Sequence, residues 1–374
     1  MAGRNQDKTS EQRPALCLSG GGYRAMLFHA GAILRLSELG LLKTSPGLDG
    51  IASVSSVSGG SMTAAAASLN WNELSAGQTT GFVAAIQRLV NHTLIDPELL
   101  AKALLEGGVN KHITQRLDDL GLKDASLQSL PEHPNFIINA TNMLTTVRWE
   151  FTRGHMGDYR TGYIANPELA LSQAVSASAA YPPYLSPAHL NLKPSDFTPD
   201  TGTDCTSDGY RTAVKLTDGG IYDNLGLEAV WKDHQQLIVS DASAPTATET
   251  TLDDDWLHQS LRVIDIVDRQ VSSLRKRMLM SRVEDGTLSA AYWNIADDIK
   301  NYPADNTLPC PIEQTTILAH METDLEKKSA MQQQRLMNWG YALSDAAVRS
   351  YVLKEAAAPS EFPYPEAGVG SSDN

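Results

Sequence analysis

Two short apolar runs near the start of the chain each end in small residues and lead directly into a stretch with helical spacing. Residues 15–19 form the first run, and a glycine triplet separates it from residues 23–39. Residues 51–55 form the second run, which passes through a Ser-Gly-Gly turn into residues 61–69. This repeated order of strand, turn and helix is typical of parallel α/β proteins. It predicts a three-layer α/β/α sandwich with a mostly parallel central sheet.

The length of 374 residues suits one α/β domain that carries insertions. We place this domain at residues 14–353, with a helical insertion at residues 71–124, where apolar residues recur at helical spacing. Residues 1–13 are polar and charged, and residues 354–374 are rich in Ala, Pro, Gly and Ser. We therefore expect a disordered leader and a disordered tail on either side of the domain.

Composition excludes several classes of protein. The net charge of −14 disfavours binding to nucleic acid. Three widely separated cysteines, an odd number, indicate a reducing compartment rather than a disulfide framework. The first residues contain no apolar signal segment, and no apolar run approaches the ~20 residues of a membrane span, so we expect a cytoplasmic protein. No motif indicates a metal or a cofactor, and nothing indicates an oligomeric state.

The glycine triplet Gly20, Gly21 and Gly22 lies between the first predicted strand and the first predicted helix. Its amides are open to a ligand, and a helix N-terminus favours negative charge, so they can stabilise the oxyanion of an acyl transfer. The spacing up to Ala25 also fits the Gly-x-Gly-x-x-Ala fingerprint of dinucleotide-binding proteins. That fingerprint needs an acidic residue at the end of the second strand. Here the second strand runs into serines, which argues against nucleotide binding.

Ser58 occupies the place of a nucleophile between the second predicted strand and the helix that follows. A serine hydroxyl must be exposed and oriented before it can attack, and the Gly-x-Ser-x-Gly elbow achieves this with a tight strand-to-helix turn. Gly59 and Gly60 follow Ser58, but Ser56 replaces the first glycine of the pattern. Ser58 alone among the neighbouring serines has the elbow position. A serine-rich loop that caps a helix would give a similar sequence.

Asp218 follows the apolar run at residues 213–216 and precedes two glycines. This context predicts a carboxylate at the C-terminal end of a strand, where open α/β sheets bind their ligands. Within reach of Ser58, such a carboxylate can act as a general base. A simple Asp-Gly turn is the alternative. We expect a helix at residues 225–231. No histidine completes a catalytic triad, and we expect His29 to pack or to form a hydrogen bond.

At these residues the chain resembles the patatin-like phospholipases. That family has a Gly-Gly-Gly-x-Arg oxyanion loop, a Gly-x-Ser-x-Gly elbow and an Asp-Gly-Gly/Ala aspartate, in this order. The matching segments here are residues 20–24, 56–60 and 218–220, and residues 177–184 resemble a fourth block, Ala-Ser-x-Ala-x-Pro. The resemblance covers about residues 14–353. It implies a Ser-Asp dyad, which explains why no histidine is needed.

The resemblance implies a lipid acyl hydrolase that cleaves ester bonds of phospholipids or lysophospholipids. Ser58 would be the nucleophile and Asp218 the base. The oxyanion hole would comprise the glycine triplet and Gly59, and Arg24 would shape that loop or meet a phosphate. The expected partner is a lipid or acyl ester. Two alternatives stay open, an esterase that acts on a non-lipid acyl ester, and a nucleotide-binding or non-enzymatic protein on a Rossmann-like sheet.

A long helix predicted at residues 261–283 raises the question of membrane contact. Its apolar residues recur at spacings of three and four, and its basic residues lie elsewhere on the helix. A basic amphipathic helix can lie on a lipid surface. A helix packed on the sheet with its charges in solvent has the same pattern and is commoner. The sequence leaves peripheral membrane contact and packing as alternatives. The basic residues are Arg269, Arg275, Lys276, Arg277 and Arg282.

Overall fold

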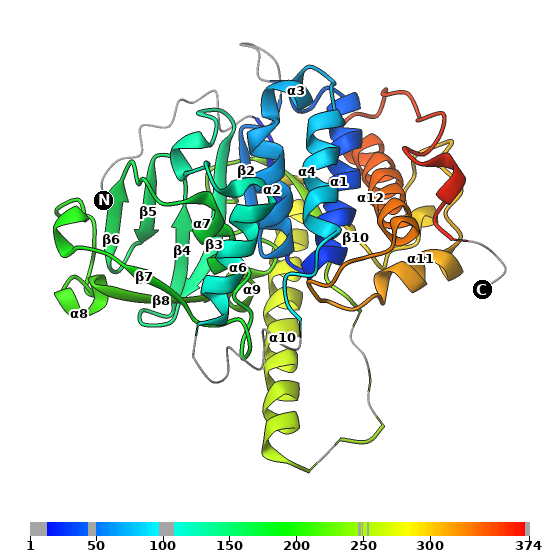
Figure 1. The fold of residues 1–374 in the computed structure, drawn as a ribbon. Helices are drawn as coiled ribbons and strands as arrows, with labels where there is room; N and C mark the ends of the chain where they lie inside the picture. The colour runs from blue at the N-terminus through cyan, green and yellow to red at the C-terminus, as the bar shows by residue number, and fades with distance from the viewer. Residues whose placement is uncertain are drawn as a thin grey trace.

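The computed structural model of the chain describes residues 13–43, 50–96, 108–245, 248, 250–252 and 254–370. A ten-stranded sheet runs through the molecule, with the strand order β10-β9-β1-β2-β3-β4-β5-β6, and with β8 paired to both β3 and β7 (Figure 1). The strands are β1 (Ala15–Leu18), β2 (Ser53–Val57), β3 (Asn135–Asn142), β4 (Val147–Phe151), β5 (His155–Asp158), β6 (Gly162–Ala165), β7 (Ala188–Asn191), β8 (Ala213–Asp218), β9 (Gln236–Asp241) and β10 (Ser289–Asn294).

The central part of the sheet is parallel, which confirms the predicted fold class. Strands β10, β9, β1, β2 and β3 all pair in parallel. Beyond β3 the sheet continues with strands whose antiparallel direction the sequence pattern does not reveal. Both faces are buried, because side chains of β1 alternate between two cores. Leu16 and Leu18 enter the larger core, and Ala15 and Cys17 enter the smaller one.

Helices cover both faces of the sheet and give the three layers. Helices α1, α2, α4, α6, α7 and α12 contribute to the larger core, and the smaller core contains residues 225–231 and one end of α10. The principal helices are α1 (Gly22–Glu38), α2 (Gly59–Leu69), α3 (Trp71–Ser75), α4 (Thr80–Val90), α6 (Val109–Leu117), α7 (Leu171–Ser178), α8 (Asp208–Arg211), α9 (Gly220–Asp223), α10 (Trp256–Glu284), α11 (Ile312–Ala319) and α12 (Ala330–Tyr351). Across the described residues, every helix is too short or too polar to cross a bilayer.

The predicted helix at residues 225–231 is wrong. A single turn of helix, α9, precedes this segment, and the segment itself consists of turns. Gly226 has a φ of +66°, which no helix residue adopts. The carboxylate of Asp223 accepts hydrogen bonds from the amides of Leu225 and Glu228 at 3.2 and 2.8 Å. These bonds satisfy the backbone locally, so the apolar side chains are buried without a helix.

The chain beyond α12 packs on the domain up to Gly370, although its composition predicts a disordered tail. Asn338 is fully buried in α12, and its side chain donates to the carbonyls of Tyr364 and Gly368 at 2.8 and 2.7 Å. Phe362 is buried and belongs to the larger core. One polar side chain in the helix therefore fixes a segment that has little apolar content of its own. The first 12 residues of the predicted leader, and residues 97–107 of the predicted insertion, lie outside the described residues.

Helix α10 projects from the body of the molecule at its N-terminal end (Figure 1). Three of its basic side chains face the body instead of solvent or lipid. Arg275 forms an ion pair with Glu228 at 2.6 Å, and Lys276 lies over the ring of Tyr292 at 4.4 Å. Arg282 donates to the Trp231 carbonyl at 3.2 Å. The sequence left two interpretations of residues 261–283, membrane contact and packing on the sheet, and both placed the basic side chains outward. Both are wrong for Arg275, Lys276 and Arg282.

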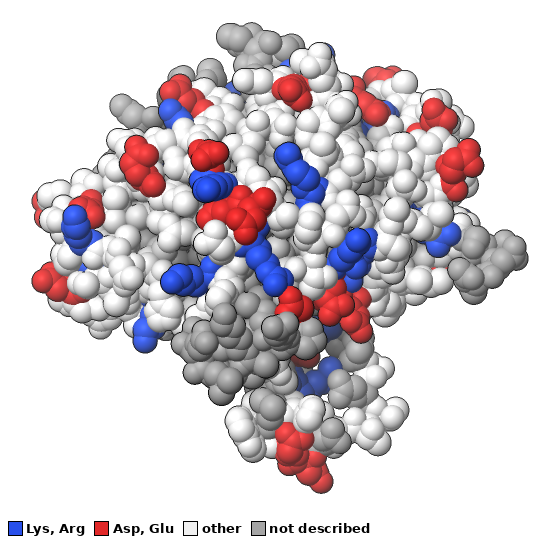
Figure 2. Space-filling view, viewed as in Figure 1, with Lys and Arg blue, Asp and Glu red and all other residues white. Residues whose placement is uncertain are grey.

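The outward side of α10 carries several exposed apolar side chains. Figure 2 shows the projecting part of the helix as mostly uncharged on the visible face, with acidic side chains near its tip. Of the large apolar side chains, Trp256 is the most exposed, at 78%. Three basic side chains of the helix are therefore packed on the body while several apolar ones lie in solvent, unlike in an ordinary surface helix. We call these side chains the outer face of α10: Trp256, Val263, Ile266, Val267, Leu274 and Met278.

Candidate active site

Strands β2 and β8 meet end to end along one edge of β3. Strand β2 runs parallel to β3 as far as the pair Val57–Asn139, and β8 runs antiparallel to β3 as far as the pair Asp218–Ala140. Because β4 occupies the other edge of β3, β2 and β8 must share the remaining edge. The residue after β2 is Ser58, so the pairing brings it beside Asp218. The sequence predicts this meeting of residues but not the antiparallel direction of β8.

Ser58 has the backbone geometry of a strained turn. Its φ is 52° and its ψ is −119°, in a region that residues with a side chain seldom adopt. Gly59, at the start of α2, approaches the loop before α1 so closely that a Cβ there would overlap the Gly22 carbonyl oxygen. Strand, serine, glycine and helix thus form the elbow arrangement that the sequence predicts.

A group of buried serines surrounds the elbow. The Ser58 amide donates to Ser178 Oγ at 2.9 Å, and Ser61 Oγ lies 2.9 Å from the same atom. Ser61 Oγ also donates to Ser56 Oγ at 3.0 Å. Ser56 therefore does more than replace the small glycine of the motif, because its hydroxyl joins the network under the turn.

Asp218 is buried and touches the proposed nucleophile. Its Oδ1 accepts from the Gly220 amide at 2.7 Å, and the Ser58 side chain lies near enough to lower the pKa of the carboxyl group. Burial raises the pKa of Asp218 to about 7, and the negative charge of Asp268 acts in the same direction. The Gly220 amide and the Ser58 side chain oppose this rise only in part. At neutral pH the carboxyl group therefore exchanges its proton readily, as a general base must.

The glycine loop presents free amides to the same space. Within the described part of the chain, the amides of Gly21, Gly22 and Gly59 have no acceptor. Gly22 has a φ of +60°, and a Cβ there would overlap the backbone of Asp324, so only glycine fits. Gly20 differs from our prediction. Its amide donates to the Asn224 backbone and side-chain oxygens at 3.2 Å each, and is not free for an oxyanion.

Arg24 is buried at the start of α1 and holds the loop against later parts of the chain. Its guanidinium donates to the carbonyls of Met321 and Ala242, the latter at 3.1 Å. Burial lowers the pKa of Arg24 to about 10, although Asp241 and Asp324 oppose the change. These bonds agree with the predicted role in shaping the loop. The Nε atom has no partner among the described residues.

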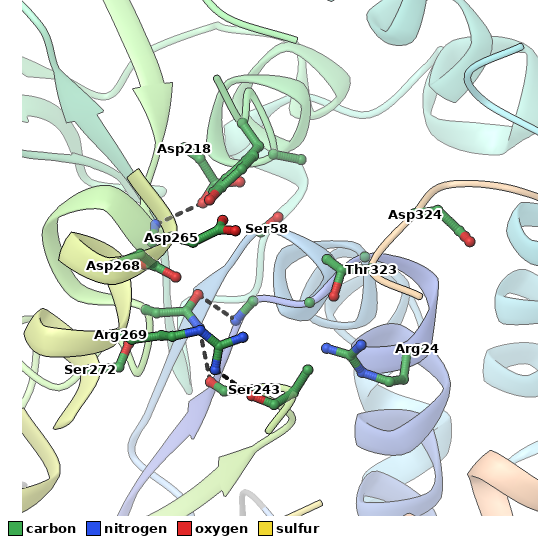
Figure 3. Close-up of a pocket in the computed structure, with 18 of the residues that line it drawn as sticks. Arg24, Ser58, Asp218, Ser243, Asp265, Asp268, Arg269, Ser272, Thr323 and Asp324 are labelled. Atoms are coloured by element: carbon green, nitrogen blue, oxygen red, sulfur yellow. Dashed lines mark hydrogen bonds between the residues drawn. The ribbon is translucent and has the colours of Figure 1, made fainter. Parts of the chain in front are cut away.

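A pocket of about 710 Å³ opens in front of Ser58 and Asp218 (Figure 3). The inner side of α10 forms one wall, and Asp265 and Asp268 extend from it toward the site (Figure 3). Apolar and aromatic side chains form other walls. The described residues contain no group of three or more His, Cys, Asp or Glu side chains placed to hold a metal ion. Apolar lining residues include Ile95, Tyr181, Tyr184, Leu185 and Leu325.

Sequence reasoning missed Asn224, Ser178 and Asp268. Asn224 binds the glycine loop, Ser178 binds the elbow, and Asp268 lines the pocket. Asn224 and Ser178 lie within or beside recognised motifs, but only the folded chain shows what they contact. Asp268 belongs to no motif. His29 has the expected structural role, because its ring binds Ser240 Oγ at 2.8 Å and the Ser19 carbonyl at 2.9 Å.

Comparisons with known proteins agree on the fold. A family model described as patatin-like phospholipase matches residues 16–231. Human GIVD cytosolic phospholipase A2 aligns with a TM-score of 0.52 at 14% identity, over 93% of this chain and 60% of the human chain. The same human protein in complex with methyl gamma-linolenyl fluorophosphonate inhibitor and terbium chloride aligns with a TM-score of 0.52 at 16% identity, over 93% and 59%. A comparison with curated proteins gives no match. At these identities the structural likeness shows the fold alone.

Proposed function

Because the chain belongs to the patatin-like phospholipase family, we propose that it hydrolyses acyl ester bonds of phospholipids or lysophospholipids. The chain spans about 60% of the length of the human phospholipase chains that it resembles. The lipid class is therefore proposed from the family and from the site together. The meeting of Ser58 and Asp218 at the adjoining ends of β2 and β8, inside a pocket that also contains free amides, is the observation that carries the proposal.

In the first half of the reaction, Ser58 Oγ attacks the ester carbonyl carbon while its proton passes to Asp218. The amides of Gly21, Gly22 and Gly59 receive the negative charge that develops on the carbonyl oxygen. The tetrahedral intermediate then collapses. The bond to the leaving alcohol breaks, Asp218 returns the proton to that alcohol, and the acyl group remains on Ser58.

In the second half, water enters after the alcohol has left. Asp218 takes a proton from the water as its oxygen attacks the acyl carbonyl, and the same amides stabilise the second oxyanion. The bond to Ser58 Oγ breaks, and the proton passes to the serine. The products are a free carboxylic acid and the original enzyme, so protons and bonds balance over the cycle.

A fluorophosphonate probe with an alkyl chain tests the proposal directly. We expect covalent labelling at Ser58 and loss of both labelling and hydrolysis in Ser58→Ala. Asp218→Asn should lose at least ~100-fold in kcat, the lower range for general-base catalysis. The double variant should be no worse than Ser58→Ala, because the two residues act as a unit. Ser68→Ala is the control, since Ser68 lies in α2, the helix that follows Ser58, and bonds only to the Ala65 carbonyl.

The same assay separates the alternatives. Wild-type labelling with activity only on short soluble esters would favour a non-lipid esterase. Absence of labelling at Ser58, together with tight binding of a nucleotide, would contradict the hydrolase and favour the Rossmann-like binding protein. A panel of diacyl phospholipids, lysophospholipids and short-chain esters with one common acyl group gives the substrate class.

We also propose that the outer face of α10 contacts the lipid surface. Its inner side lines the pocket, so contact through the outer face would hold the pocket against the lipid that supplies the substrate. Apolar side chains here are about half exposed or more, a feature that marks interaction surfaces. The contact would be apolar rather than electrostatic, because Arg275, Lys276 and Arg282 bind the body of the protein.

A further inference from the structure

Ser178, the last residue of α7, connects the two halves of the site. Its hydroxyl accepts a hydrogen bond from the amide of Ser58 at 2.9 Å. Its backbone carbonyl accepts from the amide of Gly219, the residue after Asp218, at 3.2 Å. Ser178 is fully buried and does not line the pocket, so it does not reach the substrate. One residue thus holds the backbone on both sides of the Ser58–Asp218 contact.

The hydroxyl of Ser178 has both an acceptor and a donor partner in this arrangement. A serine hydroxyl has one proton to donate and two lone pairs to accept with. The proton goes to the Asn139 carbonyl at 2.6 Å, and a lone pair accepts from the Ser58 amide at 2.9 Å. Since β3 contains Asn139, the hydroxyl fixes the strained elbow to the strand against which β2 and β8 meet.

The end of α7 also holds the end of β8. The last carbonyls of a helix have no partner within the helix. Here the Ala180 carbonyl, just past the helix, accepts from the amide of Asp218 and from Thr217 Oγ1, both at 2.9 Å. Together with the bond from Gly219 to Ser178, these contacts anchor the strand end that carries the proposed base.

We propose that Ser178 is a positioning residue that sets the geometry between Ser58 Oγ and the Asp218 carboxylate. The inference rests on the proposed function. Without the hydroxyl, the Ser58 amide loses its acceptor, and the strained turn is free to relax. A shift of the nucleophile by about 1 Å can cost on the order of 100-fold in rate. The substrate pocket is unaffected, because Ser178 is not part of its lining.

The test compares four proteins: wild type, Ser178→Ala, Ser178→Thr and Ser172→Ala. Ser172 is the matched control, since it lies in the same helix and is equally buried, but its hydroxyl has no partner in the described part of the chain. For each protein we would measure kcat, KM, the rate constant of fluorophosphonate labelling and the melting temperature. Activity is expressed per labelled site, so that unfolded molecules do not contribute.

Ser178→Ala should lower kcat and the labelling rate constant by roughly 10- to 100-fold, with KM changed less than about twofold. Ser178→Thr keeps the hydroxyl and should retain most of the wild-type kcat per labelled site, and Ser172→Ala should behave as wild type. A Ser178→Ala protein with a lower melting temperature but wild-type kcat per labelled site would overturn the inference. If the wild type itself shows neither labelling nor hydrolysis, the proposed function fails instead, so the two failures are distinguishable.

Discussion

At the scale of single residues, the pKa of Asp218 makes the first prediction. A base works only in its deprotonated form, and the pKa of this carboxyl is about 7. We therefore expect kcat on a soluble ester to rise about tenfold per pH unit below pH 7 and to level off above it. A profile that is flat between pH 5 and 8 would contradict Asp218 as the base.

Asp268 should contribute to this profile. It lies in the pocket wall, its own pKa is raised to about 6 by burial, and its charge raises the pKa of Asp218. Replacement by Asn removes that charge, so the midpoint of the pH–kcat profile should move to lower pH. Arg269 and Asp265 also act on Asp268, and Asp265→Asn, on the same helix, is the comparison. An unchanged midpoint in Asp268→Asn would contradict an effect of the Asp268 charge on the pKa of Asp218.

The raised pKa of Asp218 also predicts that the site destabilises the fold. In the folded protein the group binds its proton more tightly than its ordinary value of 3.8 allows. Its contribution to the free energy of unfolding is therefore fully present below about pH 4 and is lost as the pH rises to about 7. The loss is at most roughly 4 kcal/mol, from ~1.4 kcal/mol per pKa unit. Asp218→Asn does not titrate, so it should be more stable than wild type at pH 8 by denaturant unfolding. The difference should shrink toward pH 4.

Prediction from sequence succeeds for residues whose local context fixes their conformation. Ser58 and Asp218 follow strands and precede glycines, and that context alone places each at a turn. Asn224 and the occupied amide of Gly20 could not be predicted in this way. Their hydrogen bond joins segments far apart in the chain, and no local pattern encodes which distant carbonyl will reach an amide.

At the scale of elements, α10 shows that the spacing of apolar residues does not determine which face of a helix packs on the body of the protein. The spacing of apolar residues gives the helix correctly, but it does not say which stripe faces the body. Here aromatic rings and acidic groups of the body attract the basic stripe, through Trp231, Tyr292 and Glu228. Packing partners elsewhere in the chain therefore override the ordinary rule for a surface helix.

Replacing Val263, Ile266 and Val267 with serine tests the outer face of α10. These side chains are about half exposed and do not line the pocket. If they enter a lipid surface, each loses roughly 1 kcal/mol of transfer free energy on replacement. Sedimentation with phosphatidylcholine vesicles should then fall more than about tenfold, while kcat on a soluble ester stays unchanged.

Arg277→Gln is the control for electrostatic attraction, because Arg277 is the exposed basic side chain among those predicted to meet lipid. It should leave binding to neutral vesicles unchanged. Equal sedimentation of the serine variant and wild type would end the proposal for the outer face of α10.

At the scale of the whole molecule, α1 and α12 join the two ends of the domain through a buried ion cluster. Asp345 of α12 binds Arg35 of α1 at 2.8 Å and Arg349 at 2.7 Å, and all three side chains are buried. Asp345→Ala leaves two buried guanidinium groups without their carboxylate, which should cost about 3–5 kcal/mol in the free energy of unfolding. Glu38→Ala, which removes the half-exposed partner of Arg35, should cost only about 1 kcal/mol.

The fold class could be predicted from the alternation of strands and helices, but the assembly of the sheet could not. Strand β3 pairs with β2 and β8 in succession along one edge, and this choice depends on the antiparallel strands that follow it. The matched family region also ends at residue 231, whereas Asp268, Lys276 and Asp324 line the pocket from later elements. Part of the pocket wall thus lies beyond the segment in which a motif search finds its signals.

The end-to-end meeting of β2 and β8 has a consequence for when the protein becomes active during its synthesis. Ser58 leaves the ribosome long before Asp218, and the contact between them depends on pairing between distant parts of the chain. Such contacts form late, because closing a long loop costs entropy before any bond repays it. A nascent chain with a complete elbow therefore has no base beside its serine. The proposed reactivity of Ser58 would therefore appear only when the sheet closes.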